Sequence, residues 1–176
     1  SLTGQQIAEN FGHAVTGIGD IDADGRDDLL VGAPAYDGAV GANNGRAYVF
    51  SGADGSPIRT HEGPAAGDLL GNGVSGVGDV NSDGVPDYAV SATRGGPANK
   101  GSCFVYSGAD GSVIHELLAD STGSQFGQFF VGGTGDFNRD GTPDIYVGDY
   151  ADSSAYVFSG LDGTKIFDFD GIPSEG

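Results

Sequence analysis

The sequence predicts an all-β chain made of three similar four-stranded units. Glycine accounts for 34 of the 176 residues, without a Gly-X-Y period, and separates short runs of Val, Ile, Leu, Phe and Tyr. Glycines placed between short apolar runs are typical of strands joined by turns. No segment has the apolar 3.6-residue period, over roughly 12 residues, that indicates a helix. In addition, one series of landmarks occurs three times in the same order.

The repeated landmarks are an apolar residue followed by Gly, an acidic nine-residue segment, an aromatic-Val-aromatic-Ser-Gly run, and an Asp-Gly pair. The acidic segments begin at Asp20, Asp79 and Asp136, at spacings of 59 and 57 residues. The preceding pairs are Phe11-Gly12, Leu70-Gly71 and Phe126-Gly127, and the aromatic runs begin at Tyr48, Phe104 and Tyr156. Internal repeats of this length indicate stacked units that bury their cores against one another.

Each repeat contains four runs with strand character, which in the first repeat are residues 15–19, 28–33, 46–50 and 57–61. The second run is apolar without alternation in every repeat, which predicts burial on both of its faces. Sheets stacked face to face, as the blades of a β-propeller, satisfy this requirement. The alternative is a β-sandwich, which predicts polar alternation in every strand and no repeat. We expect a single unit over residues 1–176, with blades at about 11–63, 70–118 and 126–171.

The composition excludes several classes of function. The formal net charge is −18, from 25 Asp and Glu against 7 Lys and Arg, so the surface is unsuited to nucleic acid. No apolar run reaches the roughly 18 residues of a membrane-spanning helix. The chain begins at Ser1 and contains no Met, which indicates a processed or excised piece. The single cysteine, Cys103, is expected to be a small buried apolar side chain.

The acidic segments predict three Ca²⁺ sites, because Ca²⁺ takes about six to eight oxygen ligands and alternate positions of a tight loop supply them. We expect side-chain ligands at positions 1, 3, 5 and 9, a backbone carbonyl at position 7, and a turn at the Gly of position 6. The predicted ligands are Asp20, Asp22, Asp24, Arg26 and Asp28; Asp79, Asn81, Asp83, Val85 and Asp87; and Asp136, Asn138, Asp140, Thr142 and Asp144. Without a cation, each pair of carboxylates about 4 Å apart costs about 1 kcal/mol in water and about 4 kcal/mol at an effective dielectric of 20.

These loops differ from an EF-hand, which requires Glu at position 12 and a helix on each side. Position 12 is Val31, Val90 or Val147, each within an expected strand. The acidic loop is therefore predicted to join the first two strands of each blade. The Asp-Gly pairs at Asp54, Asp110 and Asp162 carry no alternate acids and are interpreted as hairpin turns between the third and fourth strands.

Together, the Phe-Gly pair, the acidic loop and Gly32-Ala33-Pro34 of the first repeat resemble the FG-GAP repeat of integrin α-subunit propellers and their bacterial relatives. The later repeats depart from this pattern, with Ser91-Ala92-Thr93 and Gly148-Asp149-Tyr150 in place of Gly-Ala-Pro. The resemblance implies a propeller fold, an extracellular or cell-surface location, and calcium held in the acidic loops for rigidity. It supplies no ligand, because function resides in sites added to a fold.

The predicted function is a binding or adhesion module for a protein or glycan, and not an enzyme. The histidines fall at non-equivalent points of the repeat, and no nucleophile-elbow, phosphate-loop or zinc motif is present. The connections at the end of each blade away from the acidic loops do not repeat, and binding residues tend to occupy such loops. The candidates there are Tyr36, Asn43, Arg94, Lys100 and Tyr150. The alternative is a carbohydrate-active propeller domain, catalytic or not, attached to a larger secreted enzyme.

Three blades are fewer than the roughly four to eight with which propellers close, so we expect two unpaired apolar end faces. Leu2, between Ser1 and Thr3, aligns with Leu117 at the end of a fourth strand, and Gly176 falls about where another Phe-Gly pair would begin. We therefore predict a homodimer in which two arcs close a six-bladed ring around a two-fold axis. The alternative is a fragment of a longer propeller.

Overall fold

The computed structural model describes residues 2–120 and 125–171 and contains three four-stranded antiparallel sheets, each in sequential strand order. The first sheet comprises β1 (Val15–Gly17), β2 (Leu29–Ala33), β3 (Arg46–Phe50) and β4 (Pro57–Glu62). The second comprises β5 (Leu70–Gly78), β6 (Asp87–Ala92), β7 (Ser102–Tyr106) and β8 (Val113–Leu118). The third comprises β9 (Phe126–Gly135), β10 (Asp144–Asp149), β11 (Ser154–Phe158) and β12 (Lys165–Asp170). We call these sheets blades 1, 2 and 3.

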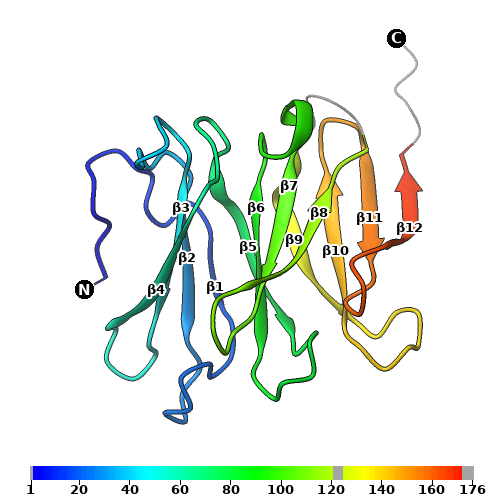
Figure 1. The fold of residues 1–176 in the computed structure, drawn as a ribbon, viewed down its shortest axis with the longest axis horizontal. Helices are drawn as coiled ribbons and strands as arrows, with labels where there is room; N and C mark the ends of the chain where they lie inside the picture. The colour runs from blue at the N-terminus through cyan, green and yellow to red at the C-terminus, as the bar shows by residue number, and fades with distance from the viewer. Residues whose placement is uncertain (1, 121–124, 172–176) are drawn as a thin grey trace.

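The blades stand side by side along the chain (Figure 1), and the predicted all-β class is confirmed. A single-turn 3₁₀ helix, Pro97–Asn99, lies between β6 and β7. None of the helices in the described part of the chain is long and apolar enough to cross a membrane. Ser1 and Gly176, on which part of the assembly prediction rests, lie outside the described residues.

The cores lie between blades. One cluster joins Ile18, Leu30 and Val49 of blade 1 to Tyr88 and Val90 of blade 2. A second cluster joins blades 2 and 3 and includes the fully buried Cys103. Every residue of β6 is buried, as the unbroken apolar pattern of the second strand predicts. The fourth strand of blade 1, β4, lies at an edge of its sheet and has no buried residue.

The connections of the blades gather at two opposite rims (Figure 1). The lower edge of the view carries the acidic loops together with the turns between the third and fourth strands, and we call it the acidic rim. The upper edge carries the connections β2–β3, β4–β5, β6–β7 and β10–β11, and we call it the opposite rim. The hairpin interpretation holds in the first of these turns, where Ser51 N donates to Ser56 O at 2.9 Å and Gly55 has φ +75°.

The two end faces of the arc differ, whereas the sequence predicts that both are uncovered. On blade 1, the N-terminal segment packs across the face, and Leu2 and Phe11 contact the cluster that contains Tyr48 and Phe50. Glu9 of this segment is buried and accepts a hydrogen bond from Tyr48 Oη at 2.8 Å. On blade 3, three phenylalanines remain about half exposed: Phe137 in the loop between β9 and β10, and Phe167 and Phe169 of β12.

Candidate metal loops and the opposite rim

The acidic loops connect the first and second strands of each blade, and we number them loop 1 (20–28), loop 2 (79–87) and loop 3 (136–144). Their backbones share one conformation. The Gly at position 6 has φ between +89° and +96° in all three loops, namely at Gly25, Gly84 and Gly141. Position 4 is also left-handed, with φ of 61° at Ala23, 61° at Ser82 and 64° at Arg139. Because none of these three residues is Gly, the second left-handed position could not be predicted from the residue types.

This conformation turns the backbone N–H groups of each loop toward its carboxylates. In loop 1, Asp24 N donates to Asp20 Oδ1 and to Asp22 Oδ1, both at 3.1 Å. Gly25 N donates to Asp20 Oδ2 at 2.8 Å, and Arg26 N donates to Asp24 Oδ1 at 2.9 Å. The same four hydrogen bonds recur in loops 2 and 3, at 2.8 to 3.1 Å. The loops are therefore ordered by their own side chains.

The carboxylate at position 9 is buried in each loop, at 1% exposure for Asp28 and 0% for Asp87 and Asp144. Asp28 Oδ2 accepts a hydrogen bond from Ile21 N at 2.8 Å, and its Oδ1 accepts one from Gly52 N at 2.9 Å. Burial raises the pKa of Asp87, against the hydrogen bonds donated by Gly108, Val80 and Asn81. This side chain thus fastens the loop to the blade in addition to facing the candidate site.

Loop 1 concentrates negative charge. Ligand atoms of Asp20, Asp22 and Asp28 all lie within 4.8 Å of one another, so this group is able to hold a metal ion. Desolvation raises the pKa of Asp22, and the charges of Asp28, Asp24 and Asp20 raise it further, while the hydrogen bond from Asp24 N opposes them. A bound cation relieves this repulsion and favours the ionised carboxylates.

Loops 2 and 3 carry less charge, because Asn replaces Asp at position 3. The amide of Asn81 donates to Asp83 Oδ2 at 2.8 Å, and that of Asn138 donates to Asp140 Oδ2 at 2.7 Å. The hydrogen bond from Asn138 lowers the pKa of Asp140, together with the one from Thr142 N. Both amides keep Oδ1 directed at the loop backbone, so an oxygen remains at position 3 with one charge fewer.

The sequence did not predict the contribution of the Ser-Gly landmark to these loops. Ser51 Oγ donates to Asp24 Oδ2 at 3.0 Å, and Ser107 Oγ lies 3.4 Å from Asp83 Oδ2. The glycine that follows is required by packing, since a Cβ on Gly52 would lie 2.0 Å from Asp27 O. The sequence did show that Ser-Gly recurs after each third strand. That the serine contacts the acidic loop follows only from the structure, which places the turn beside the loop.

The five ligand candidates occupy different environments on the opposite rim. Tyr36 is buried, with the Arg46 guanidinium carbon 3.6 Å from its ring centroid. Asn43 is exposed, and its backbone N donates to Asp37 Oδ1 at 2.8 Å. Lys100 Nζ donates to Asp120 O at 2.7 Å.

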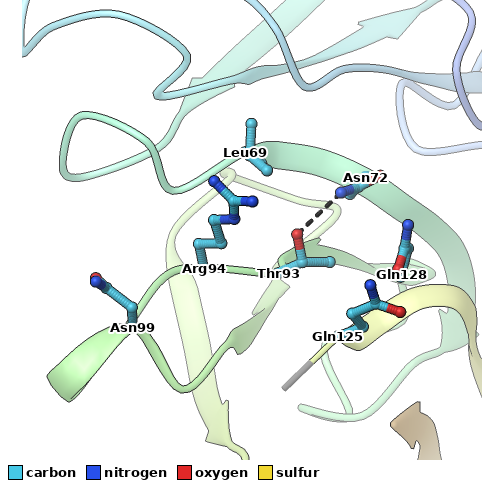
Figure 2. A pocket seen from close by; sticks show the side chains of 7 residues that line it. All are labelled: Leu69, Asn72, Thr93, Arg94, Asn99, Gln125 and Gln128. Carbon is cyan, nitrogen blue, oxygen red and sulfur yellow. Dashed lines mark hydrogen bonds between the residues drawn. The ribbon is translucent and has the colours of Figure 1, made fainter. Parts of the chain in front are cut away.

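Arg94 and Tyr150, by contrast, border cavities on neighbouring blades. Arg94 lines a cavity of about 410 Å³, which Figure 2 shows from close by. The other residues that line it are Leu69, Asn72, Thr93, Asn99, Gln125 and Gln128. Tyr150 is 69% exposed and packs edge-on against Phe129, with 5.9 Å between ring centroids. The structure thus brings two of the five candidates toward one region at the junction of blades 2 and 3.

Comparison with known sequence families identifies the repeat. The FG-GAP repeat pattern matches residues 11–50, which contain loop 1 and strands β1, β2 and β3. The first blade is an FG-GAP repeat. Blades 2 and 3 share the strand order and the loop hydrogen bonds of this FG-GAP blade, so the predicted resemblance is confirmed.

The chain is also similar to integrin α subunits. It is 37% identical over 171 residues to integrin alpha-IIb of Mus musculus, an alignment that covers 89% of this chain and 16% of the integrin. It is 32% identical over 175 residues to integrin alpha-5 of Xenopus laevis, covering 91% of this chain and 16% of that protein. The chain thus spans about one sixth of the length of these relatives.

Among solved structures, the fold is shared with a rhamnogalacturonan lyase of Bacillus licheniformis. The TM-score is 0.57 at 15% sequence identity, and the match covers 90% of this chain and 34% of the lyase chain. At this identity the likeness concerns the arrangement of the blades alone.

Proposed function

We propose that this chain is a calcium-stabilised, extracellular or cell-surface binding module with three FG-GAP blades in one unit, and that it is not an enzyme. The observation that carries the proposal is the recurrence of one loop geometry in all three blades, in which the position-1 carboxylate accepts the same backbone hydrogen bond from position 5. Similarity to integrin α subunits over most of the chain supports the same class of function.

Three Ca²⁺ ions are proposed, one in each acidic loop. The donors are oxygen atoms only, as Ca²⁺ prefers, and the loops are tight enough to surround one ion. In loop 1, Asp20, Asp22, Asp24 and Asp28 would supply carboxylate oxygens and Arg26 its carbonyl. Loops 2 and 3 would use the equivalent residues with Asn81 and Asn138 at position 3. The role of the ion is to neutralise the loop and hold it against the neighbouring turn.

Binding is assigned to the opposite rim, through Arg94 and Tyr150 first, with Asn43, Lys100 and the Tyr36–Arg46 pair around them. The test is to replace Arg94 and Tyr150 together by alanine and to measure ligand capture, the unfolding midpoint and calcium binding. Loss of capture with unchanged stability and calcium binding supports the assignment. Capture that survives the double change would place the ligand elsewhere.

A second candidate function is a carbohydrate-active domain attached to a larger secreted enzyme. The polar cavity of about 410 Å³ beside Arg94 favours it, because a concave site with convergent polar groups suits a small ligand better than a flat protein surface. Incubation of purified protein with polysaccharides, followed by end-group analysis, tests for bond cleavage. A cleavage activity that is lost with Arg94→Ala would replace the binding module by an enzyme.

For assembly, we keep the homodimer that closes a six-bladed ring as a proposal, with a longer propeller as its alternative. The half-exposed phenylalanines of blade 3 favour a covered face in solution. Phe169 pairs with Ala155 as Leu117, the equivalent of Leu2, pairs with Cys103. Closure therefore requires rearrangement at blade 1, because Leu2 and the partner's equivalent of Phe169 would occupy the same place on that face. Light scattering in calcium buffer tests the dimer, and a mass near 17.6 kDa at micromolar concentration would exclude it.

A further inference from the structure

The segment from Phe126 to loop 3, which forms β9, is one residue longer than the equivalent segments of blades 1 and 2. Asp136 follows Phe126 by 10 positions, whereas Asp20 follows Phe11 by 9 and Asp79 follows Leu70 by 9. The register of the sheet locates the difference, because Phe126 pairs with Asp149 and Val131 pairs with Val147. From Phe126 to Val131 the chain of β9 advances five positions while β10 advances two, whereas from Leu70 to Val74 β5 advances four positions against two of β6. The scaffold does not require this insertion, since the other two blades form the same sheet without it.

The insertion presents two phenylalanines to solvent. Phe129 is 59% exposed and Phe130 is 61% exposed, and their ring centroids lie 6.3 Å apart. With Tyr150 they form an exposed aromatic cluster, which we call the aromatic ledge. Phe130 and Tyr150 also line a second cavity of about 410 Å³. Solvent-exposed aromatic side chains grouped at one place on a surface indicate a binding site.

The ledge adjoins the polar cavity of Figure 2. Gln128 lines this cavity, and it also lines a smaller cavity of about 320 Å³ together with Phe129. Figure 2 shows Arg94, Asn72, Gln125 and Gln128 around Thr93, with Asn99 to one side beyond Arg94. These residues come from three separate segments of the chain. An apolar surface and a polar pocket thus share a border at Gln128.

Two groups in the polar cavity lack partners. Across the described residues, side-chain ion pairs are formed by Arg46 and Lys165, and Arg94 takes part in none, although the chain has 25 acids. Gln128 Oε1 is buried and accepts no hydrogen bond from any described residue. Arg94 is exposed, so its charge is available to an anionic ligand, whereas the buried Gln128 oxygen without a donor favours a ligand that completes it.

We propose that this site binds an acidic carbohydrate, with the carboxylate of a uronic acid on Arg94. This deepens the proposed binding function and rests on it. The carboxylate accepts hydrogen bonds from the guanidinium, hydroxyl groups donate to Gln128 Oε1 and exchange hydrogen bonds with Asn72, Asn99 and Gln125, and the apolar face of a sugar ring packs on the aromatic ledge. An acidic peptide also has backbone N–H groups that can donate to the buried oxygen. We choose the carbohydrate because the exposed aromatic ledge beside the pocket suits the flat apolar face of a sugar ring.

The test is calorimetric titration of the calcium-loaded protein with a panel of uronic-acid oligosaccharides built from galacturonate, glucuronate or mannuronate. The matched probe is the same oligosaccharide with its carboxyl groups reduced to hydroxymethyl. We expect at least one acidic oligosaccharide to bind about tenfold or more tightly than its reduced form, since a charge-assisted hydrogen bond is lost. Free calcium is held constant, because uronates also bind this ion.

Variants with matched controls separate the contribution of Arg94 from that of the aromatic ledge. Arg94→Gln is expected to remove the difference between the acidic and reduced probes, whereas Arg139→Gln, at an exposed arginine on the acidic rim, is expected to preserve it. Phe129→Ser with Phe130→Ser is expected to weaken both probes, whereas Leu161→Ser, at an exposed leucine in the turn between β11 and β12 on the acidic rim, is expected to weaken neither. Unchanged unfolding midpoints show that the variants remain folded.

The proposal is overturned if no acidic oligosaccharide binds, if the reduced probe binds equally well, or if Arg94→Gln leaves the preference intact. If the oligosaccharides fail but Arg94→Gln abolishes capture of an acidic peptide, the carbohydrate assignment falls and the binding function of this rim stands. If neither ligand class depends on Arg94 or the aromatic ledge, the proposed location of binding falls as well.

Discussion

Asp28 Oδ1 accepts a hydrogen bond from Gly52 N at 2.9 Å, which joins the acidic loop of blade 1 to the turn between β3 and β4. The same bond links Asp87 to Gly108 at 2.9 Å and Asp144 to Gly160 at 3.1 Å. The carboxylates of each acidic loop therefore have two different roles. The buried position-9 carboxylate anchors it to the blade, and the exposed carboxylates at earlier positions gather toward the candidate ion.

The anchoring role and the ion-binding role predict different consequences for two substitutions in loop 1. Asp28→Ala removes a buried acceptor of two backbone N–H groups and should lower the free energy of unfolding by about 3 kcal/mol, even in chelator. Asp24→Ala removes an exposed acceptor and should cost about 1 kcal/mol or less in chelator, while abolishing calcium binding by this loop. Urea unfolding with and without calcium separates the effects. Equal losses in chelator would contradict the division.

The glycine of each Ser-Gly landmark is predicted to be required by close approach of the backbone. A Cβ on Gly108 would lie 1.8 Å from Pro86 O, whereas a Cβ on Gly17 would meet only Asp28 O at 3.9 Å. Gly108→Ala should therefore destabilise the chain by about 2 kcal/mol or more, and Gly17→Ala should change stability by less than about 0.5 kcal/mol. Thermal unfolding of both variants checks this, and a tolerated Gly108→Ala would show that the turn relaxes easily.

His61 predicts a pH dependence of stability. It stacks on Tyr106 with 3.8 Å between ring centroids and lies 2.8 Å from Tyr88 Oη. Burial, with a smaller contribution from Arg59, lowers its pKa from 6.5 to about 4. The unfolded chain therefore binds a proton between these values that the folded chain does not, so stability falls as the pH is lowered through this window, by at most about 3 kcal/mol.

The comparison that isolates this residue is His61→Gln against the parent chain between pH 4 and pH 7. The variant should lose the part of the pH dependence that belongs to His61, while His13→Gln, at an exposed histidine, should retain it. Unfolding free energies at each pH provide the measurement. Parallel curves for the parent and His61→Gln would show that the imidazole titrates normally in the folded state.

Much of the fold was predictable from the sequence because the repeat imposes it. The landmarks fixed the order of the strands, and the unbroken apolar run of β6 predicted burial on both faces. The candidate ligands of loop 1 were predictable from spacing, and Asp20, Asp22 and Asp28 do come together. Such inferences succeed where each position has the same environment in every blade.

The remaining features depend on packing between segments that are distant in the sequence. The spacing of the landmarks did not show that Ser51 reaches Asp24 or that Leu2 covers an end face. Phe129 and Phe130 were missed although the longer spacing in the third repeat was visible, because their exposure depends on where the extra residue enters β9. Tyr36 was selected from its loop, but Arg46 lies over its ring.

The most direct test of the account is calorimetric titration of the chelator-treated chain with Ca²⁺. The three loops predict a stoichiometry of three, with affinities of about 10⁻⁴–10⁻³ M as in extracellular modules. At millimolar calcium each site then adds roughly 0.4–1.4 kcal/mol to the free energy of unfolding, so the unfolding midpoint should fall on chelation. Asp24→Ala should reduce the stoichiometry to two. A stoichiometry of zero, or a midpoint that chelator leaves unchanged, would contradict the central claim.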